Sequence, residues 1–166
     1  LCTGARARPL PIPGADLNAV HYLRTMDDVK GIQASAKTAK TAVIIGGGYI
    51  GLETAASLNK LGVKVTLLET ESRLLKRVAS PQVSAFYLRL HTEEGIDIRL
   101  DTQAAKLLGD QALTQVICAD GTAIDADMAI IGIGVIANTE LASDAGLTVD
   151  NGILAVSYTH LTLPTI

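Results

Sequence analysis

Residues 41–69 read TAVIIGGGYIGLETAASLNKLGVKVTLLE. The β-branched run before Gly46 predicts a buried parallel strand, and apolar residues from Ile50 to Leu61 recur at helical spacing. Gly62 lies where a left-handed helix end is expected, and a second apolar run then leads to Glu69. The stretch therefore predicts a strand, a helix and a second strand, with a tight glycine turn after the first strand.

The glycine turn matches G-x-G-x-x-G at Gly46, Gly48 and Gly51. Such glycines allow a sharp turn, close approach of a pyrophosphate and packing of the helix against the sheet, and a helix N-terminus favours an anion. Glu69 follows about 20 residues after the first glycine, where a carboxylate accepts the hydroxyls of an adenosine ribose. A merely structural unit is the alternative, but the strand, the helix and the acid together favour a dinucleotide site.

The acids after the second strand also predict which dinucleotide binds. The 2′-phosphate of NADP would face Glu69 and Glu71, and like charges at that distance weaken binding. NADH is therefore favoured over NADPH. Arg73 in this loop would partly offset the two acids.

Length and composition exclude several functions. The chain has 166 residues, enough for one domain, and its 48% hydrophobic and 19% charged residues fit a buried parallel sheet. Its net charge of -3 and its lack of Trp offer no surface for nucleic acid, and no apolar run approaches the length of a membrane span. Because no signal peptide is visible, we expect a cytoplasmic protein. Cys2 and Cys118 lack metal-ligand or C-x-x-C spacing, so we expect both to be buried small apolar residues and no metal site.

Two further helices are expected on either side of this stretch. Thr25 is placed to cap a helix from about residue 27 to 37. A second helix is expected to begin after Ser80, and His91 near its end would carry a partly positive imidazole that suits the helix dipole. We expect this second helix to pack through an apolar stripe made of Val83, Phe86, Tyr87 and Leu90.

The last third of the natural sequence predicts short strands. Alternating segments at 102–108, 113–119 and 122–124, with Asp-Gly between the last two, predict a small antiparallel meander inserted as a crossover. A buried strand at 126–131 then ends at Gly132, Ile133 and Gly134. Glycines at the carboxyl end of a strand again permit close approach to a ligand.

Several segments together resemble the NADH-dependent, FAD-containing ferredoxin reductases, a family that includes putidaredoxin and rubredoxin reductases and lies in the pyridine nucleotide-disulfide oxidoreductase superfamily. They are Y-I-G-L-E after the glycine turn, Thr3-Gly4 before a proline-rich loop, L-R-T around Arg24, and GIGVIAN at 132–138. The family usually has alanine where this chain has Cys2, and proline where it has Ala137.

The resemblance implies an α/β fold: a Rossmann-like NAD-binding domain with a parallel sheet and a small antiparallel β-meander crossover, flanked by pieces of an FAD-binding domain. Residues 1–19 would end the FAD-binding domain, 20–135 would bind NADH, and 136–155 would return into the FAD-binding domain. Residues 156–166, VSYTHLTLPTI, do not continue the family pattern and resemble a translated sequencing adapter, so we expect a non-native tail.

The resemblance also implies a reaction, in which hydride passes from NADH to FAD and electrons pass on to an iron–sulfur acceptor, a ferredoxin or rubredoxin. Tyr49 and Ile50 would border the nicotinamide, and Glu53 would orient its carboxamide, although Glu53 also fits a solvated first-turn acid. Arg24 would touch FAD, with a plain surface charge as the alternative. The expected cofactor-binding residues are Thr3, Gly4, Arg24, Gly46, Gly47, Gly48, Tyr49, Ile50, Gly51, Glu53, Glu69, Gly132, Ile133 and Gly134, and no catalytic residue is assigned.

Two other readings remain open. An NADH oxidase or a disulfide reductase would share this fold but needs a redox-active cysteine upstream of Leu1, and a non-catalytic NADH-sensing module would share it too. The missing N-terminal half would discriminate between them. For the isolated chain we expect NADH binding, but neither stable FAD binding nor turnover.

Overall fold

The computed structural model describes residues 1–155. The chain divides into two compact units, one spanning Pro9–Ile133 and the other formed by Leu1–Arg8 with the segment that starts at Gly134. The sequence-based boundary at 19/20 lies eleven residues after the first of these divisions, and the one at 135/136 lies two residues after the second. The assignment of the flanking segments to an FAD-binding domain stays a prediction. The expected tail at 156–166 lies outside the described residues.

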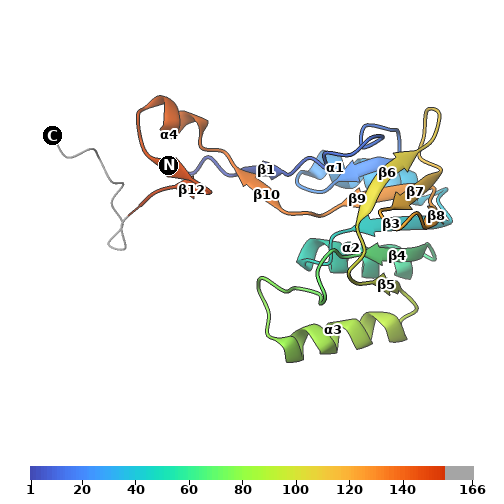
Figure 1. The fold of residues 1–166 in the computed structure, drawn as a ribbon. Helices are drawn as coiled ribbons and strands as arrows, with labels where there is room; N and C mark the ends of the chain where they lie inside the picture. Colours follow the sequence, from blue (N-terminus) through green and yellow to red (C-terminus); the bar gives the residue numbers. More distant parts are fainter. Residues whose placement is uncertain (156–166) are drawn as a thin grey trace. The chain divides into compact units, whose positions relative to one another are not determined.

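A five-stranded parallel sheet forms the centre of the larger unit (Figure 1). Its order is β2-β9-β3-β4-β5. The strands are β2 (Val20–Tyr22), β9 (Met128–Ile131), β3 (Thr41–Ile45), β4 (Lys64–Leu68) and β5 (Asp97–Arg99). From β3 the chain steps to β4 and then β5 on one side, and β9 later enters on the other side of β3. The sheet therefore has a reversal point between β3 and β9, the place where open parallel sheets bind ligands.

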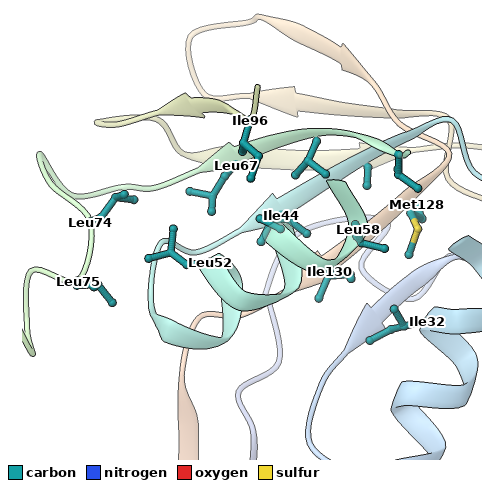
Figure 2. Packing of buried hydrophobic residues seen from close by; sticks show 14 residues of the cluster. Ile32, Ile44, Leu52, Leu58, Leu67, Leu74, Leu75, Ile96, Met128 and Ile130 are labelled. Carbon is teal, nitrogen blue, oxygen red and sulfur yellow. The ribbon is translucent and has the colours of Figure 1, made fainter. Parts of the chain in front are cut away.

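The two faces of the sheet carry separate hydrophobic clusters, because alternate residues of each buried strand point to opposite faces. Ile44, Leu67 and Ile130 lie in one cluster together with Ile32 of α1 (Met26–Ala36) and Leu58 of α2 (Tyr49–Lys60). Figure 2 shows these side chains, with Leu52 of α2 and with Leu74 and Leu75 from the loop after β4. The helices therefore cover one face of the sheet.

The opposite face is covered by the predicted meander. Its strands are β6 (Ala104–Leu108), β7 (Gln115–Cys118) and β8 (Ala123–Asp125), paired antiparallel in that order (Figure 1). Val116 of β7 and Leu107 of β6 pack in one cluster with Val43 of β3. The meander connects β5 to β9, so its prediction as a crossover is confirmed.

Local sequence signals explain where the first two helices begin and end. The Thr25 hydroxyl accepts the Asp28 N–H of α1, and the Asp28 carboxylate accepts the Thr25 N–H at 2.6 Å, which confirms the predicted cap. Gly62 ends α2 with φ +85°, as the left-handed C-cap requires.

Helix α3 (Pro81–Glu93) has the predicted Ser80 cap but not the predicted packing face. Val83, Phe86 and Leu90 are exposed, at 41%, 49% and 37%, and the helix instead buries Ser84 and His91. Tyr87 alone of the predicted stripe packs against the core. The prediction failed because Ser84 and His91, which lie at helical spacing on the buried face, are polar.

The environment of His91 also bears on the charge that the sequence predicted for its imidazole. It is 7% exposed, and burial lowers its pKa from the ordinary value, which disfavours the imidazolium. The imidazole stacks on Tyr87 with ring centroids 6.1 Å apart. His91 is therefore a packing residue, as expected, and its burial works against the partly positive form that the sequence predicted.

The smaller unit is built on two antiparallel pairs. β1 (Ala5–Ala7) pairs with β10 (Val135–Ala137), and β11 (Val149–Asp150) pairs with β12 (Gly152–Ile153). Between these pairs lies the short helix α4 (Glu140–Asp144). Cys2 of this unit is exposed, so its predicted burial was wrong, whereas Cys118 is buried as expected. Across residues 1–155, none of the helices is long and apolar enough to cross a membrane.

Candidate dinucleotide site

The site residues of the larger unit follow the carboxyl ends of four parallel strands. Arg24 comes after β2, Gly132 after β9, Gly46 after β3 and Glu69 after β4. Parallel strands end at the same edge of a sheet, so their loops share that edge. Within it, the Gly46 N–H donates to Leu68 O and the Gly132 N–H donates to Ile45 O, each at 2.8 Å, and these bonds extend the ladder into the glycine turns.

Two glycines of the turn are required by the protein itself. Gly46 has φ +116°, and a Cβ there would lie 2.4 Å from the Gly132 carbonyl oxygen. A Cβ on Gly51 would lie 2.0 Å from the Gly46 carbonyl oxygen. The start of α2 therefore packs directly on the turn, the close packing that the sequence predicted for the third glycine. The turn also packs directly on the end of β9, a contact that the sequence did not predict.

Gly48 differs from these two because no other part of residues 1–155 occupies the space where its Cβ would lie. A Cβ added to Gly48 meets nothing within 4 Å, and its φ of -81° suits any residue. Gly48 is the N-cap of α2 and offers no side chain to the N–H groups of the first turn, which have no intrahelical partners. An open space before a helix N-terminus fits a bound pyrophosphate.

Glu69 joins the end of β4 to the glycine turn. Its Oε2 accepts the Gly47 N–H at 2.6 Å, and its Oε1 accepts the Glu71 N–H at 2.8 Å. Oε1 also accepts the Thr70 hydroxyl at 3.2 Å. A carboxylate has about four lone-pair positions, so one position on Oε2 remains for a further hydroxyl group. Glu69 therefore shapes the turn, a role the sequence did not predict, and ribose binding by Glu69 stays a prediction.

Two cations of the following loop, Arg73 and Lys76, already have partners. Lys76 forms an ion pair with Glu71, and its hydrogen bond lowers the pKa of that carboxyl below its ordinary value. The Arg73 guanidinium donates to Lys76 O, Ala79 O and Ser84 Oγ, each at 2.8 Å. Arg73 is thus bound to its own loop, and its expected availability to offset the acids is not supported.

The first turns of α2 present the residues expected near the nicotinamide. Tyr49 is 52% exposed and Ile50 is 38% exposed. Glu53 is exposed too and borders a groove of about 360 Å³ between α1 and α2, lined among others by Leu23, Val29, Ile32, Ser57 and Leu61. Exposure leaves these three residues available to a ligand, and their roles stay predictions.

The remaining predicted residues are Arg24 and Ile133 of the larger unit and three residues of the smaller unit. The Arg24 N–H donates to Asp28 Oδ2 at the start of α1, and FAD contact by Arg24 stays a prediction. Thr3, Gly4 and Gly134 belong to the smaller unit, where the Asn138 amide donates to Thr3 O at 2.9 Å. Ile133 packs partly against the meander cluster. Among residues 1–155, no three His, Cys, Asp or Glu side chains gather as metal ligands would.

A parallel sheet with a glycine turn at its reversal point and an acid at the tip of the next strand defines a dinucleotide-binding α/β protein. The model of the pyridine nucleotide-disulphide oxidoreductase family matches residues 1–166, and the chain belongs to this family.

Similarity to individual proteins of this family supports the same assignment. The chain is 47% identical over 172 residues to putidaredoxin reductase of Pseudomonas putida, covering 100% of this chain and 41% of the relative. Among solved structures, it matches putidaredoxin reductase in its covalent complex with putidaredoxin, with a TM-score of 0.86 and 49% identity, covering 90% of this chain and 37% of that one. The ferredoxin reductase of the CYP199A2 system from Rhodopseudomonas palustris matches with a TM-score of 0.88 and 36% identity, over 90% and 37%.

These matches confirm the predicted fold class and the resemblance to ferredoxin reductases. They also show that the chain spans about two fifths of the length of these relatives.

Proposed function

We propose that this chain is the NADH-binding part of an FAD-dependent oxidoreductase that passes hydride from NADH to FAD and electrons on to a ferredoxin or rubredoxin. The observation that carries the proposal is the open space at Gly48, at the start of α2 and one residue after Gly47, which is bonded to Glu69. The partner proposal is supported by similarity to a reductase that forms a complex with putidaredoxin. A cytoplasmic location for the whole protein stays a prediction.

The residues present fit a dinucleotide. Gly48 leaves room where a pyrophosphate must approach, the first turn of α2 supplies N–H groups, and Glu69 faces the turn from β4. In this arrangement the protein fixes distance and orientation, while hydride acceptance is the chemistry that FAD supplies when bound. Tyr49, Ile50 and Glu53 are the side chains we assign to the nicotinamide end.

FAD needs a second binding surface. Of the predicted FAD contacts, Thr3 and Gly4 lie in the smaller unit, and Arg24 lies at the start of α1. The relatives are more than twice as long as this chain, so we assign the other flavin contacts to the segments they carry beyond it. The chain alone is expected to bind NADH without retaining FAD.

Calorimetric titration of the chain with NADH, NADPH and FAD tests the proposal. Saturable NADH binding, with much weaker NADPH binding and no FAD retained, is the expected result. Equal affinity for both nicotinamide dinucleotides contradicts the role of Glu69. A folded chain that binds neither contradicts the proposed site.

A further inference from the structure

We propose that Arg73 is a positioning residue of the NADH site, because it closes the loop of residues 70–80 over Gly47 and so fixes the direction of the Gly48 N–H. This inference rests on the proposed NADH binding. It assigns Arg73 a role opposite to the one its charge suggests, namely that of an internal anchor instead of a ligand for a 2′-phosphate.

The anchoring begins at the Arg73 guanidinium. Its Nη1 donates to Ala79 O and to Ser84 Oγ, and its Nη2 donates to Lys76 O. Ser84 is 2% exposed, and its hydroxyl donates in turn to Leu74 O at 2.6 Å. The two ends of the loop are therefore tied together and to the buried face of α3.

The anchored loop holds Leu75 in a strained conformation. Leu75 has φ +54°, a left-handed backbone that is disfavoured for an ordinary L-residue because its Cβ comes too close to the following carbonyl oxygen. Leu74 and Leu75 are 1% and 3% exposed, and both extend from the loop into the cluster that includes Leu52 (Figure 2). Such strain persists only where surrounding contacts hold it, and it is concentrated at functional sites.

The strained residue reaches the glycine turn. The Leu75 N–H donates to the Gly47 carbonyl oxygen at 3.0 Å, while the Gly47 N–H donates to Glu69. A trans peptide is planar, so the direction of the Gly47 carbonyl sets the opposite direction of the Gly48 N–H. Gly47 and Gly48 carry no Cβ, so nothing intrinsic to them prevents this peptide from flipping. The bond from Leu75 supplies that restraint.

The same contacts remove Arg73 from any role as a phosphate ligand. To reach a 2′-phosphate, its guanidinium would have to leave three oxygen acceptors. Removal of Arg73 should therefore weaken NADH and NADPH binding by the same factor. A direct ligand role predicts a loss for NADPH alone.

The test compares Arg73→Met, Arg73→Lys and Ser84→Ala with Arg77→Met, which removes the same charge from an exposed position of the same loop. Affinities for NADH and NADPH come from calorimetry, and amide exchange followed by NMR reports Leu75 against Val43 in the centre of β3. We expect Arg73→Met to weaken both dinucleotides about tenfold and Ser84→Ala about threefold, as expected for lost bonds to a charged group, with NADH affinity unchanged in Arg77→Met. Arg73→Lys should be intermediate, because one ammonium can meet Ala79 O and Ser84 Oγ but not Lys76 O as well.

In Arg73→Met and Ser84→Ala the Leu75 amide should exchange faster while Val43 stays protected. Unchanged Leu75 exchange with unchanged NADH affinity overturns the inference, as does a loss confined to NADPH. If Val43 also loses protection in Arg73→Met, that variant has destabilised the whole fold. The Leu75 exchange and NADH affinity of Ser84→Ala and Arg73→Lys then decide whether the inference holds. If the unaltered chain does not bind NADH, the proposed function fails, and the exchange measurements still decide whether Arg73 holds the loop.

Discussion

The substitution Gly48→Ala tests whether the space beside Gly48 is needed for ligand binding and not for folding. Because an added Cβ meets no protein atom within 4 Å and φ is -81°, the fold should tolerate alanine. Alanine is a poorer N-cap than glycine, but it also restricts the unfolded chain by about 0.4–1 kcal/mol, so these effects nearly cancel. We expect the melting temperature to change by no more than about 3 °C. The methyl group would occupy the space proposed for the pyrophosphate, so NADH affinity should fall at least about tenfold, or about 1.4 kcal/mol.

Gly46→Ala is the matched control, since it adds the same methyl group two residues earlier. Its Cβ would overlap the Gly132 carbonyl oxygen at 2.4 Å, at φ +116°. Strain and overlap each cost about 1–3 kcal/mol, or about 2–6 kcal/mol together, so the melting temperature should fall by about 4–24 °C. Circular dichroism gives the melting temperatures and calorimetry gives the affinities. Full NADH affinity in a folded Gly48→Ala variant, or equal loss of stability in both variants, would refute the reasoning.

Three further predictions concern charge and packing. Glu69→Gln should raise NADPH affinity relative to NADH about fivefold in calorimetry, because a solvated charge at close range contributes about 1 kcal/mol; an unchanged ratio contradicts this role. Backbone hydrogen bonds from Lys40 and Thr41 lower the pKa of Asp127 below its ordinary 3.8, so the stability it provides is present above that pH and lost as pH falls through the folded value. Asp127→Asn should cost about 1 kcal/mol at pH 7 after solvent screening, and thermal melts should show the difference shrinking below about pH 3.8. Phe86→Ser on the exposed face of α3 should change the free energy of unfolding by less than about 1 kcal/mol, against about 2–5 for Leu58→Ala, and denaturant titration of both variants would reveal a covered Phe86 if the losses were similar.

Most of the fold was predictable from the sequence because local signals and burial agree. Residues 42–45 of β3 and 128–131 of β9 are all apolar, as is typical of strands covered on both faces, and Gly46 and Gly132 follow them. In β4 the apolar residues Val65, Leu67 and Leu68 surround one buried threonine. The Asp-Gly turn and the alternating segments predicted the meander because both are local signals of antiparallel strands. These elements could be predicted because burial pattern and turn residues act over only a few neighbouring residues.

The failures concern long-range packing. On α3, hydrophobicity selected Phe86 and Leu90, but the face toward the core holds Ser84, which is bonded to Arg73, and His91. Burial of a polar residue is acceptable only when a partner is present, and the partner of Ser84 lies eleven residues earlier in the chain. Leu75 shows the same limit for the site, because no local signal marks a leucine as having a positive φ. Glu69 was identified as a site residue, but its bond to Gly47 became visible only in the structure.

The pairing of β1 with β10 brings together the two points at which the chain enters and leaves the larger unit. The Arg8 N–H donates to Gly134 O at 3.0 Å, and these residues directly precede Pro9 and directly follow Ile133. The chain therefore enters and leaves the larger unit at neighbouring points, as inserted domains commonly do. A unit whose two ends lie close together can be replaced as a whole. We therefore expect that replacing Pro9–Ile133 by the matching segment of a relative would give the protein that relative's preference between NADH and NADPH, without changes to the surrounding residues.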